Sequence, residues 1–433
     1  MDCKWFWVFL VMMLVSLGEG CWEEERTALL QLKHFFPNPY GYLYNWVKNS
    51  ECYRWERVMC DNNTGRVIKL HLWDVRDFNL GEWYLNASLF SPFQQLQSLN
   101  LSGNNIAGCI ENESQLSSSL QLNLFLHLGF ERLSRLSNLE ELNLAKNNFN
   151  NSILSSLAGF SSLKYLYLFV NRFKGAINIE GLHSLKELYM SYLKELYMSY
   201  NEIDHFVSRR GLNNLEVMDL SYNNLNNSIL SSLGDLSSLK SLDLNSNGLT
   251  GTVDVQGLCS LKNLEELYMD GNKIDKFVNS KDYRGLKKLN TLSLQSGIET
   301  TDATIFLQST LRSFPSLKTL DLSDNSFNQT MIARELHNLT TLEELNLDES
   351  ELHISFLQTV ATCTSLKHLS MRYCELNGIS QVQDSIYFRN LESLDMEGTT
   401  LNNSFSQIFK PIISFKKLSL SNCGLNGKLF DQG

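Results

Sequence analysis

Leucines recur along this chain with a fixed internal spacing, and mostly polar residues fill the positions between them. The segment from Leu96 to Ile106 has apolar residues at its first, fourth, sixth and eleventh positions and an asparagine at its ninth, and the segment from Leu139 to Phe149 repeats this arrangement. Further copies begin at Val67, Leu163, Leu193, Leu215, Leu239, Leu264, Leu289, Leu317, Leu342, Leu366, Leu391 and Phe415. About fourteen units result, most of them 22 to 25 residues apart. A tandem period of this length predicts a solenoid of stacked coils.

Each part of the unit has a physical role. Alternate residues of a strand point to opposite faces, so the two leucines of Leu-x-Leu enter a shared interior and the residue between them faces outward. The asparagine that follows turns the chain, and its amide can satisfy backbone groups inside the turn. This ladder comprises Asn104, Asn147, Asn171, Asn201, Asn223, Asn247, Asn272 and Asn325, and it continues as Ser350, Cys374, Thr399 and Cys423. The unit is that of leucine-rich repeats and predicts an α/β solenoid, a curved array with a parallel β-sheet on its concave face.

Two segments within the repeat region, residues 66–430, depart from the period. The octamer LKELYMSY occurs twice in succession at 185–200, and its second copy alone leads into Asn201 in register. The leucines Leu99 and Leu142 are 43 residues apart, and the excess includes a Ser- and Leu-rich run at 114–129. We interpret the first segment as a tandem duplication and the second as an irregular insertion on the convex side.

The first coil of a solenoid needs a cap over its open core, and residues 21–65 fit this role. Three glutamates, Glu23 to Glu25, favour the start of a helix, where the helix dipole is positive. An apolar helical face follows, and tryptophans further along can close over the first strand. The residues of this predicted cap core are Ala28, Leu29, Leu32, Phe36, Trp46, Trp55 and Val58. We therefore expect a helical N-terminal cap.

Residues 1–20 have the pattern of a secretory signal peptide. Lys4 precedes an apolar run from Trp5 to Leu17, and Gly18 and Gly20 supply small residues before a cleavage point. A bacterial lipoprotein site at Cys21 is an alternative interpretation. Thirteen residues are too few to span a bilayer, and no later stretch is long and apolar enough, so the sequence predicts a secreted protein. Nine glycosylation sequons agree with this route: Asn62, Asn86, Asn100, Asn112, Asn150, Asn226, Asn328, Asn338 and Asn402.

Outward-facing aromatic and acidic residues gather on neighbouring strands of the predicted concave face. Exposed aromatic clusters commonly anchor protein and peptide ligands, although tyrosine also suits strands for its β-propensity alone. The predicted ligand-binding residues are Tyr165, Tyr167, Phe169, Tyr197, Tyr200, Asp219, Tyr222, Asp243 and Tyr268. A glycan on Asn100, which belongs to the same outward column, would keep ligand away from the first coils.

Other chemistry finds little support. The net charge is −10, and the sequence contains no basic stripe that could neutralise the phosphates of a nucleic acid. The sequence contains neither a phosphate loop nor a zinc-protease or Cys-x-x-Cys motif, and the eight histidines have no metal-ligand spacing. We therefore expect no enzyme activity, no cofactor and no metal. Cys259 and Cys363 precede strand leucines, where we expect them to be buried.

The N-terminal region resembles the cap of plant leucine-rich-repeat receptor-like proteins and kinases. The resemblance rests on Glu25–Lys33, Trp46, Cys52–Cys60, Gly65–Leu70 and Leu89–Leu96, and on the octamer NNSILSSL that begins at Asn150 and again at Asn226. It covers residues 1 to 430 and points to the receptor-like-protein branch. That family implies an extracellular ligand, often in pathogen defence, and a partner kinase at the plasma membrane.

Three features depart from this family. Tyr53 stands where the family has a second cysteine, so Cys52 is left to pair with either Cys21 or Cys60. The family's Gly-x-Ile-Pro segment lacks its proline at Gly175–Asn178 and Gly251–Asp254. Later repeats, a C-terminal cap, a membrane helix and a cytoplasmic tail do not follow, so we expect a truncated product or a partial gene model.

Three functional interpretations follow. The first is the extracellular, non-enzymatic recognition module of a plant cell-surface receptor-like protein, which binds a peptide or protein ligand and acts in defence or developmental signalling with a co-receptor kinase in the membrane. The second is a secreted inhibitor of a pathogen cell-wall hydrolase, similar to polygalacturonase-inhibiting proteins, which have a shorter array. The third is a truncated decoy fragment.

Overall fold

A computed structural model describes residues 21–37, 40–110, 129–157, 159–178, 193–207, 212–234, 236–279, 286–300, 302–328, 341–378, 386–401 and 416–424. The chain divides into two compact units, Met1–Leu215 and Glu216–Gly433, each of which is described by itself. The predicted signal peptide, the insertion at 114–129 except Gly129, and the first octamer copy at 185–192 lie outside the described residues.

The first unit begins with the helix that the sequence predicts. Helix α2, Glu23–Phe35, has three glutamates in its first turn and Lys33 and His34 in its last, which suits the helix dipole at both ends. The helix buries Ala28, Leu29 and Leu32. The rings of Trp46 and Trp55 stack 5.5 Å apart, and the indole N–H of Trp46 donates to the Glu56 carbonyl at 2.9 Å. The helix and the buried tryptophans of the cap are thus confirmed.

Glu25 has a role in this cap that the sequence did not reveal. Its carboxylate is fully buried and accepts a hydrogen bond from the Val67 backbone N–H at 3.0 Å, at the start of the first long strand. The Nε atom of Arg66 lies 3.0 Å from the other carboxylate oxygen, and the Arg66 guanidinium lies over the Trp22 ring at 4.2 Å. Burial raises the pKa of Glu25, and the Val67 N–H and Arg66 oppose that rise. The residue therefore joins the cap helix to the first coil.

A single disulfide in the cap joins Cys21 to Cys52, at the 3-10 turn η1, Cys52–Arg54. The Sγ atom of Cys60 lies 3.8 Å from that of Cys21 and remains a thiol. Burial, with Glu25 nearby, raises the pKa of this thiol to about 11. Of the two pairings that the sequence left open for Cys52, the structure therefore has the one with Cys21.

The main sheet of unit 1 follows the repeat register. Strand β1, Val58–Cys60, pairs antiparallel with β2, Val67–His71. Parallel strands then follow in the order β4, Ser98–Asn100; β6, Glu141–Asn143; β7, Tyr165–Tyr167; and β9, Glu195–Tyr197. One leucine of each of these parallel strands lies opposite that of the next strand in register and is fully buried: Leu70, Leu99, Leu142, Leu166 and Leu196. Strands β4 and β6 are direct neighbours despite the 43-residue spacing of their leucines.

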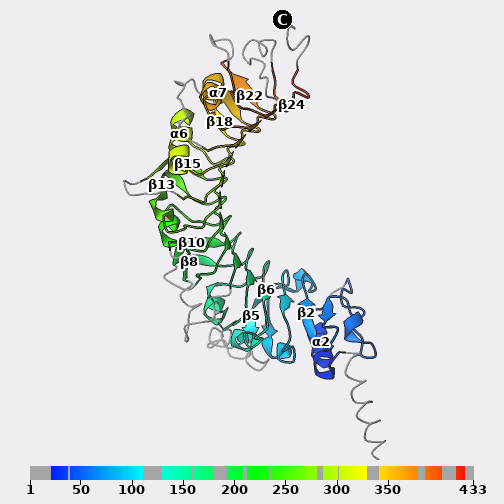
Figure 1. The fold of residues 1–433 in the computed structure, drawn as a ribbon. Helices are drawn as coiled ribbons and strands as arrows, with labels where there is room; N and C mark the ends of the chain where they lie inside the picture. Colours follow the sequence, from blue (N-terminus) through cyan, green and yellow to red (C-terminus); the bar gives the residue numbers. More distant parts are fainter. Residues whose placement is uncertain are drawn as a thin grey trace, which may run out of the picture. The chain divides into compact units, whose positions relative to one another are not determined.

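The main strands of unit 2 continue the same pattern. They are β11, Val217–Asp219; β12, Ser241–Asp243; β14, Glu266–Tyr268; β16, Thr291–Ser293; β17, Thr319–Asp321; β19, Glu344–Asn346; β21, His368–Ser370; β23, Ser393–Asp395; and β24, Lys417–Ser419. All adjacent pairs are parallel and in register. Each of these strands from β11 to β23 buries its middle residue, a leucine in all but β11, which has Met218, whereas Leu418 of β24 is exposed. Within each unit, this stacking of short strands over buried apolar residues confirms the predicted leucine-rich-repeat solenoid (Figure 1).

The asparagine ladder is confirmed in atomic detail. Asn147 donates through Nδ2 to the carbonyls of Leu101, Leu144 and Ala145 at 3.0, 3.1 and 3.0 Å. Its Oδ1 accepts from the N–H groups of Asn104 and Ile106 in the preceding coil at 3.1 and 2.9 Å. One side chain thereby satisfies five backbone groups in two coils, which agrees with its predicted role.

Smaller side chains replace asparagine in the later coils of unit 2 and make fewer contacts. Ser350 accepts from the Asn325 N–H at 3.2 Å, and Thr399 accepts from the Cys374 N–H at 3.0 Å. The thiol of Cys374 donates to the Leu347 carbonyl at 3.0 Å, and that of Cys423 donates to the Met396 carbonyl at 2.9 Å. These cysteines therefore act as ladder residues, with the weak hydrogen bonds that thiols form.

The residue just before each ladder position has left-handed backbone. Val170, Tyr200, Tyr222 and Tyr373 have φ values of 53°, 53°, 52° and 54°, in a region that is uncommon for residues other than glycine and asparagine. Each side chain projects into solvent at these points, and the four residues are 41 to 59% exposed. The turn geometry thus places these four side chains in solvent.

A second set of strands follows the ladder turns, and the sequence did not predict them. In unit 1, β3, Trp83–Asn86, pairs with β5, Ile106–Ile110, and β8, Lys174–Asn178, pairs with β10, Glu202–Val207. In unit 2, β13, Thr250–Asp254, pairs with β15, Lys273–Val278, and β18, Ser326–Phe327, β20, Glu351–His353, and β22, Glu375–Asn377, form a further sheet. All of these pairs are parallel, so the second strands stack coil on coil as the main strands do.

Helices and 3-10 turns complete the coils. In unit 1 these are η2, Phe78–Leu80; η3, Ala87–Phe90; η5, Asn151–Ile153; and α4, Leu154–Leu157. In unit 2 they are α5, Ile229–Ser232; η8, Val255–Leu258; α6, Ala303–Ser313; and α7, Ile354–Ala361. Figure 1 shows α6 beside β15, with which it packs. The main strands therefore have their core on this side and leave their other face uncovered; we call the latter the open face.

Candidate functional site

The predicted ligand-binding residues divide between the two units. Tyr165, Tyr167, Phe169, Tyr197 and Tyr200 belong to unit 1, and Asp219, Tyr222, Asp243 and Tyr268 belong to unit 2. In unit 1, strand β7 places Tyr165 and Tyr167 on the open face, because Leu166 between them enters the core. Phe169 continues the same alternation beyond Leu168. We call Tyr165, Tyr167, Phe169 and Tyr197 the aromatic patch.

Strand register brings the members of this patch together. Tyr167 lies opposite Tyr197 of β9, and their rings stack at a centroid distance of 4.9 Å with 8° between the ring planes. On the other side, Tyr167 lies opposite Asn143 of β6. The Oδ1 atom of Asn143 accepts a hydrogen bond from the backbone N–H of Ala145, two residues further on. The stacked rings therefore stand beside a shorter, internally bonded side chain. Such half-buried aromatic pairs can present rigid contact area to a ligand.

Carboxylates flank the patch on both neighbouring strands. Tyr165 lies opposite Glu141 on one side and Glu195 on the other. The hydroxyl of Tyr197 donates to Glu195 at 2.8 Å. Burial raises the pKa of the Tyr167 hydroxyl, and the charges of Glu141 and Glu195 raise it further. The surroundings of these rings are thus negatively charged.

Tyr200 and Tyr222 stand apart from the strand residues. Each occupies the left-handed position of its turn, and they are 52% and 47% exposed. The sequence placed them beside the patch by their proximity in the chain, but a left-handed residue does not continue the strand alternation. Their position is therefore at the end of a strand, next to the ladder residues Asn201 and Asn223.

In unit 2 the predicted acids lie on the open face and are held by their own turns. Asp219 accepts from the N–H and hydroxyl of Ser221, and Asp243 accepts from the Asn245 N–H at 2.9 Å. The Tyr268 hydroxyl donates to Glu266 at 3.2 Å. Tyr268 lies opposite Asp243 on one side and Ser293 on the other, so it has no aromatic neighbour in its row. This group is acidic rather than aromatic.

Asp243 carries a marked pKa shift. Burial raises its pKa from 3.8 to about 6, and the charges of Asp219 and Asp270 add to this, while the Asn245 N–H lowers it. A raised carboxyl pKa means that the folded protein holds the proton more tightly than the unfolded chain. Its contribution to the free energy of unfolding should therefore fall as pH rises from about 4 to about 6, and stay low above that range.

We predict that Asp243→Asn raises the free energy of unfolding at pH 7 by about 1–2 kcal/mol, after a discount for solvent screening. Asparagine keeps an oxygen for the Asn245 N–H and removes the charge, and Asn143 and Asn346 already occupy the same row in other coils. Urea denaturation of both proteins between pH 4 and pH 8 checks this. The two stabilities should converge near pH 4, and a constant difference across the range would contradict the prediction.

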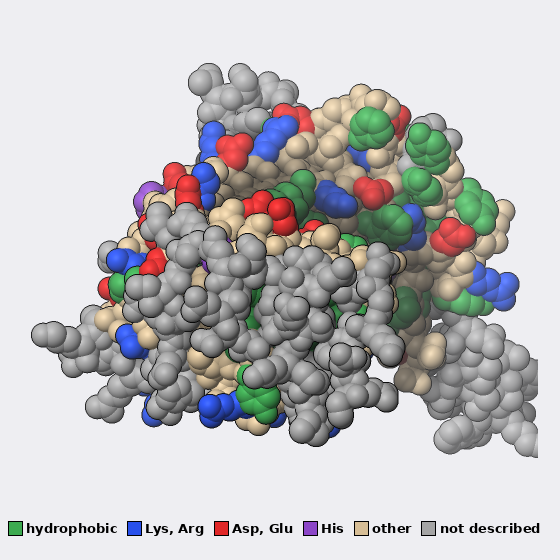
Figure 2. All heavy atoms as spheres, turned by 90° about the horizontal axis from the view of Figure 1, so that it is seen from above, with side chains coloured by type: hydrophobic (Ala, Val, Ile, Leu, Met, Phe, Trp, Pro, Cys, Tyr) green, Lys and Arg blue, Asp and Glu red, His purple; other side chains and the backbone are tan. Residues whose placement is uncertain are grey.

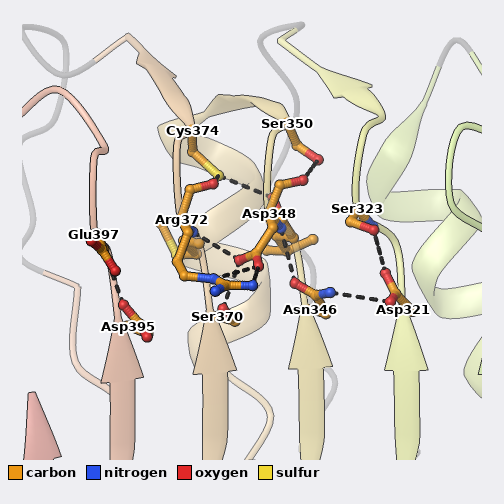
Figure 3. A network of polar contacts seen from close by, with 12 residues as sticks. Asp321, Ser323, Asn346, Asp348, Ser350, Ser370, Arg372, Cys374, Asp395 and Glu397 are labelled. Carbon is orange, nitrogen blue, oxygen red and sulfur yellow. Dashed lines mark hydrogen bonds and ion pairs between the residues drawn. The ribbon is translucent and has the colours of Figure 1, made fainter. Parts of the chain in front are cut away.

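Further along the open face of unit 2, charged side chains are paired among themselves (Figure 3). Arg372 forms an ion pair with Asp348 at 2.6 Å, and Asp348 also accepts from the Ser370 hydroxyl at 2.6 Å. Asn346 donates to Asp321 at 3.1 Å, and Asp321 accepts from Ser323 as well. Figure 2 shows acidic and basic side chains interspersed on the face that it draws. This network stabilises the coils and leaves little charge for a ligand.

The charged side chains in a shallow hollow of unit 2 are also paired with one another. It measures about 630 Å³, and charged side chains from successive coils contribute to its lining. Glu343 lies 2.7 Å from Lys367 and 3.5 Å from Lys318, and Glu392 lies 2.7 Å from Lys416. The charged groups of this hollow are therefore paired with one another.

Four described sequons have a structural use that their motif did not suggest. The Oδ1 atoms of Asn86, Asn100, Asn150 and Asn226 each accept from the backbone N–H of the serine two residues on. Such Asx turns explain an Asn-x-Ser pattern without a glycan, and glycosylation at these sites stays a prediction. Asn62 and Asn328 are also described, whereas Asn112, Asn338 and Asn402 lie outside the described residues.

The cysteines differ in part from expectation. Cys363 is buried as predicted, but Cys259 is exposed, so its predicted burial is wrong. Cys259 follows η8 at its C-terminal end, and the adjacent Leu258 fills the core instead. Among the described residues, the group that could hold a metal ion by distance is Cys21, Cys52 and Cys60, and the disulfide removes two of these thiols. Within the residue ranges that the structure describes, no helix has the length and apolar character needed to cross a bilayer.

Comparison with known proteins gives matches to a leucine-rich-repeat cap and to the repeats themselves. A leucine-rich-repeat N-terminal domain matches residues 23–61, and leucine-rich repeats match 95–118, 135–158, 214–236, 237–282 and 316–339. A solved structure with the same kind of repeat is the ectodomain of the Arabidopsis thaliana receptor kinase GASSHO1/SCHENGEN3 in complex with CASPARIAN STRIP INTEGRITY FACTOR 2. It aligns with a TM-score of 0.44 and 21% identity over 86% of this chain and 47% of that one.

Among curated proteins, Cuscuta receptor 1 of Solanum lycopersicum is 34% identical over 311 residues, which are 67% of this chain and 26% of that protein. Receptor-like protein 9a of Arabidopsis thaliana is 34% identical over 220 residues, which are 51% of this chain and 19% of that protein. This chain thus spans about a quarter or less of the length of these relatives. With its cap, repeats and relatives, the chain belongs to the plant leucine-rich-repeat receptor-like proteins.

Proposed function

We propose that this chain is the non-enzymatic, extracellular recognition module of a plant cell-surface receptor-like protein, and that it binds a peptide or protein ligand on its open face. The observation that carries the proposal is the stacked pair Tyr167 and Tyr197, on strands whose other face is fully occupied by the leucine core. Rigid aromatic side chains are the anchors on which protein and peptide interfaces depend most.

The relatives support a receptor role. Cuscuta receptor 1 and receptor-like protein 9a are named as receptors or receptor-like proteins, and the GASSHO1/SCHENGEN3 ectodomain is bound to CASPARIAN STRIP INTEGRITY FACTOR 2. We propose that the full-length protein containing this chain acts at the plasma membrane, with a co-receptor kinase as its signalling partner. The Cys21–Cys52 disulfide agrees with an extracellular location, because such bonds persist in oxidising compartments.

A random heptapeptide library displayed on phage tests the proposal. We expect peptides to be enriched on the purified protein and to bind the double variant Tyr167→Ala, Tyr197→Ala at least about ten-fold more weakly, since an aromatic anchor contributes about 2 kcal/mol. Tyr373→Ala is the matched control, because Tyr373 is 59% exposed but lies in a turn of unit 2. Enriched peptides that bind the double variant as tightly as the wild type would exclude the patch as the binding site.

A further inference from the structure

One row of the open face in unit 1 has a charge that the protein does not neutralise. Strand register places Glu141, Tyr165 and Glu195 side by side across β6, β7 and β9. The hydrogen-bond partners of the two carboxylates are hydroxyls: Ser98 donates to Glu141 at 2.9 Å, and Tyr197 donates to Glu195 at 2.8 Å. Among the described residues, neither carboxylate forms an ion pair.

The neighbouring row, one residue earlier in each strand, behaves differently. There Glu140 pairs with Lys164 of the next coil at 2.8 Å. In unit 2 the same row contains the pairs Glu216–Lys240 at 2.6 Å and Glu392–Lys416 at 2.7 Å. In that row, a lysine of one coil thus forms an ion pair with a glutamate of the preceding coil. Glu141 and Glu195 instead have the Tyr165 ring between them.

The protein itself shows which group fits a carboxylate beside an aromatic ring. In the cap, the guanidinium of Arg66 lies 4.2 Å above the Trp22 ring, and its Nε lies 3.0 Å from the Glu25 carboxylate. Nearby, Arg57 lies over Trp73 at 4.4 Å and over Tyr42 at 5.3 Å. A guanidinium can stack on a ring with its face while its edge donates to carboxylates, which an ammonium cannot do.

We infer that the aromatic patch receives an arginine side chain of a peptide ligand, stacked on the Tyr165 and Tyr167 rings and hydrogen-bonded to Glu141 and Glu195. This inference rests on the proposed function and adds the chemistry of the ligand. The five N–H donors of a guanidinium suffice for both carboxylates, and each carboxylate has acceptor capacity beyond its present hydroxyl partner. The stacked Tyr197 ring extends the apolar surface for the aliphatic part of the arginine.

Peptides selected from the heptapeptide library test this inference. We expect the enriched peptides to share an arginine, and replacement of that arginine by citrulline, which has the same shape without the charge, to weaken binding by about ten-fold. Lysine in its place should give an intermediate affinity. Raising the salt concentration from 0.05 to about 0.5 M should weaken the arginine peptide more than the citrulline peptide.

Glutamine variants test whether the carboxylates of Glu141 and Glu195 bind the arginine of the peptide. Glu141→Gln with Glu195→Gln should weaken the arginine peptide by about ten-fold and leave the citrulline peptide unchanged. Glu344→Gln is the matched control, because Glu344 occupies the same row on β19 and, like Glu141, accepts from a hydroxyl, that of Thr319 at 3.3 Å. Thermal unfolding of each variant verifies that the fold is intact, and glutamine retains an oxygen for the Ser98 and Tyr197 hydroxyls.

The outcomes separate this inference from the proposed function. Peptides that need Tyr167 and Tyr197 but contain no arginine, or that bind equally well with citrulline, would overturn the inference and leave the proposed function standing. Failure to enrich any peptide would count against both. Loss of arginine selectivity in Glu344→Gln would place the charge elsewhere on the protein and would also overturn it.

Discussion

Asn147→Ala should lower the free energy of unfolding by about 4 kcal/mol, because the buried N–H groups of Asn104 and Ile106 lose this acceptor at a cost of about 1–3 kcal/mol each. The carbonyls of Leu101, Leu144 and Ala145 each keep a second donor and add less. The side chain is 6% exposed, and its amide bonds to backbone in its own coil and in the preceding one. Urea denaturation followed by circular dichroism measures the change.

The neighbouring Asn148 supplies the control, because its backbone N–H donates to the Ile106 carbonyl and its side chain makes no hydrogen bond with any residue that the structure describes. Asn148→Ala should change the free energy of unfolding by about 0.5 kcal/mol or less. Asn147→Ser should fall between the two, since Ser350 performs the same role with fewer bonds. Equal effects for Asn147→Ala and Asn148→Ala would refute the ladder as a source of stability.

The second large effect is expected in the cap, where Glu25→Ala should destabilise the protein by about 3 kcal/mol, as removal of one partner of a buried ion pair does. The change leaves the Val67 N–H and the Arg66 guanidinium without their carboxylate, and Arg66 has only 16% of its side chain exposed. It also empties space beneath a helix whose other buried residues are small or branched, Ala28, Leu29 and Leu32.

Glu24→Ala is the matched control, since Glu24 precedes Glu25 in the same helix turn and is exposed. Loss of its favourable interaction with the helix dipole should cost about 0.5 kcal/mol. Differential scanning calorimetry of the two variants measures both changes. If Glu25→Ala were as stable as Glu24→Ala, the carboxylate would have no part in joining cap to coil.

The repeat fold could be predicted because its signal is redundant. Buried leucines such as Leu142 and Leu242 fix strand register in every coil, and an error in one coil is corrected by the others. The cap helix was predictable for a related reason, because its apolar face has a clear period. The second strands, β8 and β10 among them, gave no such signal, since short segments after a turn become strands only when coils stack.

Individual side chains were predictable only where the repeat alone determines their place. Tyr165, Tyr167 and Tyr197 follow from strand alternation, and the structure adds their stacking and flanking carboxylates. Glu25 could not be recognised, because its partners Val67 and Arg66 are some forty residues away in sequence. Cys259 lies beside the core residue Leu258, and a shift of one position decides between interior and solvent.

The ladder also has a direction. Asn147 accepts from coil amides that precede it in sequence, as do Asn201 for Phe173 and Asn272 for Leu249. The amides in the turn of one coil therefore lack their side-chain acceptor until the next coil has been synthesised. If the coils form in the order of their synthesis, the turn of each coil can be completed only after the next coil has been made. Substitution of one ladder asparagine should therefore leave the turn of the preceding coil incomplete.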